Sequence, residues 1–292
     1  MSGLPGARDL AELVRLPAAL TVPGDAWSGA AWAGTATAGS GLMPLGSVLL
    51  YWSGMALNDW ADRAVDAVER PERVIPSGRV KASTALGIAA GLGVGGVGVT
   101  AVVGGRRALR VSVPLAVLVA TYDVLAKDSP AGPVVMASTR GLDVLLAAAA
   151  APAGAARPAA AVAVHTAGVT LLSRGEVHGT TPARAGAALA ATAGALGILA
   201  SSIRRDAGTP TRHRRAAAAF ALLYAARVGV AQARAAASPD AVTVRAATGA
   251  GIGGLTFLQA AWLAARGRFL PAVVVAGASP LFRRVAREVS PT

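Results

Sequence analysis

The amino-acid sequence predicts an all-α protein, a polytopic membrane helix bundle with about nine transmembrane helices. Of its 292 residues, 54% are hydrophobic and only 15% are charged, and the mean hydropathy is +0.53. This apolar content exceeds that of ordinary soluble domains. Aromatic residues make up only 4% of the chain, whereas Gly alone contributes 35 residues. Such a composition favours helices that pack closely in lipid through small side chains.

A helix needs roughly 20 mainly apolar residues to cross a bilayer. This length rule gives nine spans and a shorter apolar stretch, with no residues left for a soluble domain. The spans are 17–37, 41–58, 82–104, 108–126, 133–151, 158–173, 182–203, 213–236 and 241–265, and the shorter stretch is 269–282. We therefore treat residues 1–292 as a single transmembrane domain in the cell membrane.

Polar or basic residues separate the second, third, fourth and fifth spans. The second span ends at the longest polar interruption, Asn58 to Lys81. Arg106 and Arg107 separate the third span from the fourth, and Lys127 to Ser129 separate the fourth from the fifth. Charged residues of this kind are typical of membrane surfaces.

The later spans are marked in the same way. The sixth span ends at the polar stretch Ser173 to Thr181, and the seventh ends at Arg204 and Arg205. The eighth span begins within the basic run Arg212 to Arg215, and the ninth follows Asp240.

A net charge of +13 is compatible with nucleic-acid binding, but most basic residues stand in short clusters between apolar runs. Membrane surfaces explain such clusters better, so we expect no nucleic-acid partner. The chain has no cysteine, which excludes disulfides and thiolate chemistry.

With nine spans, the N-terminus, the three polar interruptions and the loop near Asp240 lie on one side of the membrane. Twelve of the fifteen acidic residues lie on that side: Asp9, Glu12, Asp59, Asp62, Asp66, Glu69, Glu72, Asp123, Asp128, Asp143, Glu176 and Asp240. We expect the functional chemistry there. Lys and Arg divide 13 to 14 between the two sides, with Arg227 inside a span, so the positive-inside rule gives no orientation.

Three oxygen-bearing side chains follow the second span at intervals of four residues. If the helix continues, Asn58, Asp62 and Asp66 share one face, with successive Cβ atoms roughly 5–6 Å apart. Carboxylates at this spacing repel unless a cation neutralises them, and oxygen ligands favour Mg²⁺. The alternative is a solvated helix end whose acids are balanced by Arg63 and Arg70.

The pattern Asn58-Asp59-x-x-Asp62-x-x-x-Asp66, followed by Arg73-Val74-Ile75-Pro76-Ser77-Gly78, resembles the first aspartate-rich motif of the UbiA superfamily of intramembrane prenyltransferases. Val74 stands where a proline is common. The resemblance implies Mg²⁺-dependent transfer of a prenyl group from a prenyl diphosphate to a lipid-soluble, for example aromatic, acceptor. It also implies that the active face is cytoplasmic.

A second polar patch closes the fourth span and continues into the fifth. Tyr122, Asp123 and Lys127 suit the family's second loop, where a cation could hold diphosphate oxygens. Each cation also has an interpretation that involves no ligand. Lys127 could simply extend to the membrane interface, and Arg140 could form an ion pair with Asp143. The pattern Met136-Ala137-x-x-Arg140-Gly141-Leu142-Asp143 resembles a subfamily linked to the Ebo gene clusters, in which Asn takes the last position.

The family's second aspartate-rich motif is reduced in this chain to Ser173-Arg174-Gly175-Glu176-Val177-His178-Gly179. Typical members carry two or three acids there, whereas Glu176 is the one acid of this motif; it is the expected Mg²⁺ ligand, with His178 or Ser173 as further candidates. Two charges inside spans, Asp25 and Arg227, are either functional groups or a structural ion pair.

The resemblance assigns a role to each candidate residue. The expected catalytic residues are Asp62, Asp66, Lys127 and Glu176; the diphosphate ligands are Asn58, Arg73, Tyr122, Asp123, Lys127, Arg140 and Arg174; and the Mg²⁺ ligands are Asn58, Asp62, Asp66 and Glu176. The expected partners are a prenyl diphosphate, a lipid-soluble acceptor and membrane lipid. Two other functions remain open, a terpene cyclase of the same fold and a non-catalytic lipid-binding or transport component.

Overall fold

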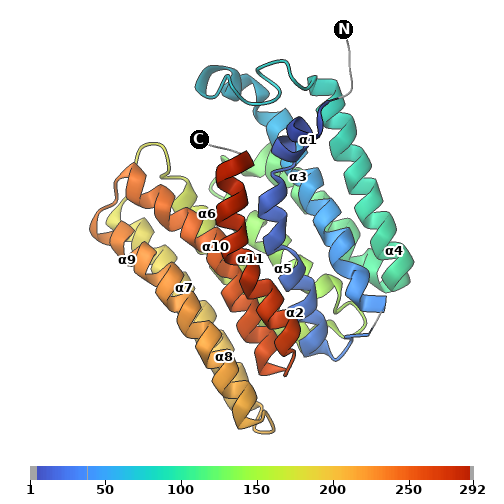
Figure 1. Ribbon diagram of the computed structural model, residues 1–292, viewed down its shortest axis with the longest axis vertical. Helices are drawn as coiled ribbons and strands as arrows, with labels where there is room; N and C mark the ends of the chain where they lie inside the picture. Colours follow the sequence, from blue (N-terminus) through green and yellow to red (C-terminus); the bar gives the residue numbers. More distant parts are fainter. Residues whose placement is uncertain (1–4, 38, 290–292) are drawn as a thin grey trace.

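The computed structural model describes residues 5–37 and 39–289, and every regular element in these ranges is helical (Figure 1). The α-helices are Ala7–Leu13 (α1), Pro23–Ala33 (α2), Met43–Glu69 (α3), Ala82–Thr121 (α4), Gly132–Leu146 (α5), Pro152–Ser173 (α6), Pro182–Arg205 (α7), Thr211–Tyr224 (α8), Val230–Ala237 (α9), Ala241–Ala265 (α10) and Phe269–Val289 (α11). Two 3₁₀ helices, Leu16–Thr21 (η1) and Gly39–Leu42 (η2), and two π-helical turns, Tyr122–Ala126 (η3) and Ala225–Gly229 (η4), complete the fold.

The predicted fold class is confirmed, since helical structure lies within each of the nine predicted spans. Five helical segments in the described ranges are long and apolar enough to cross a membrane. These are Ala82–Ala126, Pro152–Ser173, Pro182–Arg205, Thr211–Ala237 and Ala241–Ala265. The number of membrane crossings stays a prediction.

The longest of these segments contains two predicted spans, and the chain reverses between them. Gly105 has non-helical angles, φ 60° and ψ −154°, inside α4. The Thr100 hydroxyl donates to the Ser112 hydroxyl at 2.8 Å, whereas residues twelve apart in a straight helix are separated by roughly 18 Å. A turn therefore lies at Gly105, between the third and fourth predicted spans.

Small residues set the distances between neighbouring helices. A Cβ atom on Gly29 of α2 would lie 1.8 Å from the carbonyl oxygen of Val144 in α5. A Cβ atom on Gly96 of α4 would lie 2.9 Å from the carbonyl oxygen of Gly46 in α3. Only glycine allows these backbones to approach so closely, as the Gly-rich composition suggested.

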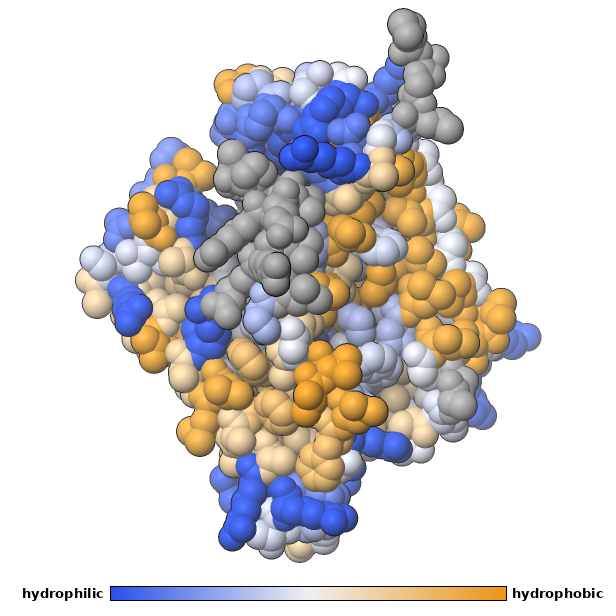
Figure 2. All heavy atoms as spheres, in the orientation of Figure 1, coloured by the Kyte–Doolittle hydropathy of each residue, from blue (hydrophilic) through white to orange (hydrophobic). Residues whose placement is uncertain are grey.

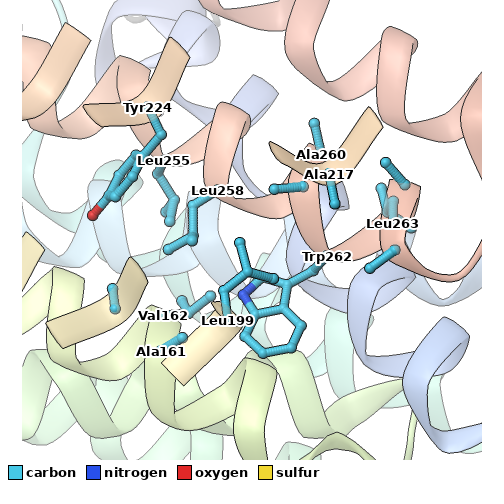
Figure 3. Close-up of a cluster of buried hydrophobic side chains, with 14 of the residues drawn as sticks. Ala161, Val162, Leu199, Ala217, Tyr224, Leu255, Leu258, Ala260, Trp262 and Leu263 are labelled. Carbon is cyan, nitrogen blue, oxygen red and sulfur yellow. The ribbon is translucent and has the colours of Figure 1, made fainter. Parts of the chain in front are cut away.

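An extensive apolar cluster joins α10 to its neighbours (Figure 3). Leu258 and Trp262 of α10 meet Val162 of α6 and Leu199 of α7 there. The Trp32 indole of α2 donates to the Trp262 carbonyl oxygen at 2.9 Å, so the N-terminal helices are fixed to the C-terminal ones.

The segments predicted to share one side of the membrane contact one another at one end of the bundle. Arg79, before α4, pairs with Glu12 of α1 at 2.9 Å. The Thr180 amide donates to the Pro239 carbonyl at 2.8 Å. Hydrophilic residues gather at both ends of the molecule, and an apolar band lies between them (Figure 2).

Candidate functional site

The α3 helix continues without interruption through Asp66 and ends at Glu69. Asn58, Asp62 and Asp66 therefore do lie along one side of a single helix, as their spacing predicted. The chain then folds back toward this helix, with a hydrogen bond from the Val80 amide to the Val74 carbonyl at 2.8 Å. Gly78 takes a positive φ of 77° in this turn, a conformation that side-chain-bearing residues rarely adopt.

The returning loop brings Arg73 to the carboxylates of α3. Its Nη1 atom lies 2.8 Å from Asp66 Oδ2 and 3.3 Å from Asp59 Oδ1. Asp59 and Asp66 are both buried, and a buried carboxylate needs such a partner.

Arg15 also contacts the candidate site, although the sequence pattern does not single it out. Its Nη2 atom lies 3.0 Å from Asp59 Oδ1 and 3.3 Å from Asn58 Oδ1. Arg15 is also the one non-glycine residue of the described ranges with a positive φ, 46°, a conformation that costs roughly 1–3 kcal/mol. Its position before the first apolar run, on the predicted acidic side, was a signal that could have identified it.

The π-helical turn η3 positions the second patch against α3. Lys127 forms an ion pair with Asp62, and Asn58 Nδ2 donates to Asp123 Oδ1 at 3.4 Å. The Lys127 amide donates to the Tyr122 carbonyl at 2.9 Å, five residues earlier. Wider turns of this kind often occur at functional sites. The structure thus joins the two predicted patches.

Arg174 fixes the end of α6 to the same region. Its Nη2 atom donates to the Lys127 carbonyl at 3.0 Å and to the Ser129 carbonyl. A Cβ atom on Gly132 would lie 2.6 Å from Arg174 Nη2, so glycine leaves the space that this guanidinium occupies.

Glu176 is half-buried in the loop after α6, and its backbone carbonyl accepts a hydrogen bond from Arg245 at 2.8 Å. Burial raises the pKa of Glu176 above its usual value, although Arg70 and Arg245 lower it. Within residues 5–37 and 39–289, no three acidic or histidine side chains gather closely enough to hold a metal ion by themselves.

The donor chemistry nevertheless fits Mg²⁺. Asn58, Asp62 and Asp66 offer amide and carboxylate oxygens, the ligands this ion prefers. Protein sites commonly hold Mg²⁺ through one or two carboxylates and complete its shell with water and substrate phosphate. A preformed three-acid cluster is therefore unnecessary for this ion.

Arg140 lies apart from the other predicted diphosphate ligands. Its Nη2 atom lies 2.7 Å from Asp25 Oδ2 and donates to the Thr21 carbonyl at 3.2 Å. Gln259 of α10 donates to Asp25 Oδ1 at 2.7 Å. The ion pair of Asp25 is thus with Arg140, and Asp143 accepts a hydrogen bond from Ser47.

An apolar cavity with about 530 Å³ of atom-free space connects these two groups of polar residues. Asp123 and Tyr122 line one part, and Ser47, Arg140 and Asp143 line another. The remaining wall is Val22, Leu50, Tyr51, Gly54, Met55, Leu115, Val119, Met136 and Thr139. Polar side chains beside an otherwise apolar wall suit an amphipathic ligand.

Comparison with known proteins identifies the fold and the family that the sequence motifs resemble. The model of the UbiA prenyltransferase family matches residues 21–267. The structure of a UbiA homologue from Aeropyrum pernix superposes with a TM-score of 0.66 at 19% identity, covering 83% of this chain and 96% of that one. A structure described as digeranylgeranylglyceryl phosphate synthase in membranes gives a TM-score of 0.56 at 16% identity, covering 92% and 98% of the two chains.

Curated relatives match shorter segments. Digeranylgeranylglyceryl phosphate synthase of Methanopyrus kandleri is 38% identical over 89 residues, which is 30% of this chain and 32% of the relative. The enzyme of the same name from Methanosarcina mazei is 50% identical over 46 residues, 16% of each chain. The matches therefore span a third or less of these relatives.

Proposed function

Because this chain belongs to the UbiA prenyltransferase family and is an integral membrane protein, we propose that it is an intramembrane prenyltransferase. It transfers a prenyl group from a prenyl diphosphate to a lipid-soluble acceptor. The observation that carries the proposal is the position of Asp123. This residue lines the apolar cavity and accepts a hydrogen bond from Asn58 of α3, the helix that also carries Asp62 and Asp66. An anionic head and an apolar tail would thus be bound side by side.

The residues divide between the metal and the diphosphate. Asn58, Asp62, Asp66 and Glu176 would hold Mg²⁺, which when bound supplies positive charge to the diphosphate oxygens. The diphosphate would also contact Arg73, Tyr122, Asp123, Lys127 and Arg174, whereas Arg140 is held in an ion pair with Asp25. Lys127 and Arg73 now pair with Asp62 and Asp66, so binding would exchange these internal partners for ligand phosphate and metal.

In the proposed reaction, the bond between prenyl C1 and the diphosphate oxygen breaks, and pyrophosphate leaves with the electron pair. A nucleophilic atom of the acceptor forms the new bond to C1 and gives its proton to a base. Lys127 and Arg73 stabilise the charge on the leaving group. The apolar cavity wall excludes water, which would otherwise capture the allylic cation.

The acceptor class is inferred from the relatives. Their name, digeranylgeranylglyceryl phosphate synthase, favours a glyceryl phosphate lipid over an aromatic acceptor. The family further favours a cytoplasmic site. A topology reporter inserted after Ser77 tests this placement, and an extracytoplasmic signal would refute it.

The decisive experiment measures Mg²⁺-dependent pyrophosphate release by the reconstituted protein from geranyl, farnesyl and geranylgeranyl diphosphates. Asp62→Asn should reduce release by roughly 10²–10³-fold, as loss of a transition-state electrostatic contact does. Glu69→Gln is the matched control, since Glu69 is an exposed acid further along the same helix.

Product analysis separates the possible functions. Release that requires an added glyceryl phosphate lipid or aromatic acceptor supports a transferase. Release with a cyclised product and no acceptor identifies a terpene cyclase. No release with any of the three diphosphates, from folded protein, supports a non-catalytic lipid-binding role and refutes the proposal.

A further inference from the structure

Arginines gather at the end of the molecule opposite the candidate site. The α7 helix ends with Arg204 and Arg205, and α8 begins with Arg212, Arg214 and Arg215. The hairpin between these helices lies at the bottom of Figure 1, and Figure 2 shows a strongly hydrophilic patch there below the apolar band. The candidate site, at the beginning of α4 and the end of α3, lies at the other end (Figure 1).

Two of the charges near this hairpin are used within the protein. Arg214 donates to the carbonyl oxygens of Asp206, Ala207 and Thr209 at 2.9–3.2 Å, which fixes the loop. Asp206, the acid of this loop, forms an ion pair with Arg266 at 2.7 Å. The internal contacts therefore leave no acid of the loop for the other arginines.

The remaining four, Arg204, Arg205, Arg212 and Arg215, are exposed, and we call them the hairpin arginines. None of them has a carboxylate partner within the described part of the chain. The first turn of α8 contains no acid, although the N-terminus of a helix favours negative charge and disfavours positive charge. The hairpin thus carries positive charge that the protein itself does not balance.

An apolar groove leads from this charge toward the middle of the molecule. The α7 helix packs on α9 and α8 packs on α10, which leaves an open groove between α7 and α8, with about 890 Å³ of atom-free space in and above it. Arg204 and Arg214 lie in the wall near the hairpin. The other lining residues are Leu196, Leu199, Ala200, Ile203, Ala217, Ala218, Ala221, Leu222 and Ala225. Because Leu222 is 71% exposed, the groove is open at the outer surface.

We propose that this groove binds an anionic phospholipid, with one acyl chain between α7 and α8 and the phosphate among the hairpin arginines. Charge complementarity selects this occupant. A zwitterionic lipid brings no net negative charge, and a second copy of this chain would add more arginines. Inorganic phosphate could meet the arginines but would leave the apolar groove empty. The site is independent of the proposed prenyl transfer, because its residues lie at the opposite end of the bundle.

Native mass spectrometry of the delipidated protein with phosphatidylglycerol or phosphatidylcholine tests the proposal. Arg204→Gln combined with Arg212→Gln should weaken phosphatidylglycerol binding by roughly 30-fold, since each arginine near a lipid phosphate contributes about 1 kcal/mol. The matched control is Arg106→Gln with Arg107→Gln, two exposed arginines at the Gly105 turn outside the groove. The control should bind phosphatidylglycerol as the unchanged protein does.

A second variant tests the groove itself. Ala218→Phe adds bulk to an exposed position of the groove wall, so it should weaken phosphatidylglycerol binding while all four hairpin arginines remain. Circular dichroism and thermal unfolding confirm that each variant is folded. Equal binding of the two lipids, equal loss in both arginine pairs, or displacement of the lipid by equimolar inorganic phosphate would each overturn the proposal.

Discussion

The guanidinium of Arg140 in α5 lies 2.7 Å from the carboxylate of Asp25 in α2. Asp25 is fully buried, and the two residues are 115 positions apart in the sequence. The charge of Arg140 is therefore already neutralised within the bundle, and this pair connects two helices whose backbones touch at Gly29.

We predict that Arg140→Gln destabilises the fold, because breaking a buried ion pair from one side costs roughly 3–5 kcal/mol. The double variant Arg140→Gln/Asp25→Asn should lose less stability than the sum of the two single variants. Unfolding followed by circular dichroism in detergent micelles measures this coupling. Arg157→Gln, at an exposed position of α6, is the control. A folded Arg140→Gln protein of normal stability but weak pyrophosphate binding would instead make Arg140 a diphosphate ligand.

Gly132 provides a second prediction. Its substitution by alanine places a Cβ atom 2.6 Å from Arg174 Nη2 and 2.8 Å from the Lys127 carbonyl oxygen. Arg174 must then move away, and Lys127 shifts with the loop that Arg174 holds. Gly132→Ala should lose roughly 1–3 kcal/mol of stability and most pyrophosphate release. Gly186→Ala is the matched control, because a Cβ atom at Gly186 meets nothing within 4 Å. Equal activity of the two variants would contradict this account.

A third prediction concerns pH. Because burial raises the pKa of Glu176, its ionised form is less favourable in the folded protein than in the unfolded chain. The resulting loss of stability is fully present above the raised pKa and disappears as the pH falls through it. Glu176→Gln should therefore unfold at a higher temperature than the unchanged protein at neutral pH, and the difference should vanish under acid conditions.

The same titration should also change the affinity for Mg²⁺. Protonation of Glu176 should increase the stability of the protein but decrease its affinity for Mg²⁺. Protonation removes a ligand oxygen charge, so Mg²⁺ affinity should begin to fall at a pH above the ordinary Glu pKa, and Glu176→Gln should lack that step. Isothermal titration calorimetry with Mg²⁺ and pyrophosphate across the pH range measures it. An unchanged pH profile in Glu176→Gln would exclude Glu176 from the metal site.

The fourth prediction concerns the N-terminal helix. Arg79 Nη1 lies 2.7 Å from Asp9 Oδ1 and 2.9 Å from Glu12 Oε2, and these are half-exposed pairs. Arg79→Gln should cost about 1 kcal/mol or less and should accelerate hydrogen exchange of the amides in α1. High salt should produce part of the same effect in the unchanged protein, since it screens exposed charges. Arg107→Gln should leave α1 exchange unaltered.

The sequence predicted the helices well because their signals are local. Apolar runs of sufficient length define the spans, and the four-residue spacing of Asn58, Asp62 and Asp66 required only that α3 continue. The contact between Asn58 and Asp123 agreed with the expectation that the acidic segments share one side.

The partner of each charge was harder to predict. Arg15 lies 44 residues before Asp59, and Asp25 pairs with Arg140, whereas the sequence suggests Arg227 as a partner. Such pairs depend on the rotation of each helix about its axis. Faces of Ala and Gly allow close packing at many rotations, so the apolar pattern contains little information on which polar groups meet.

The pairing of the α3 aspartates with lysine and arginine side chains has a consequence for how the protein folds. Asp62 and Asp66 already contact Lys127 and Arg73, so acidic repulsion in the site is relieved by the chain itself. Many metal sites form only when the ion arrives, and their folding waits for it. Here Lys127 and Arg73 balance these carboxylates without an ion, so we expect the bundle to fold in the membrane irrespective of the magnesium supply.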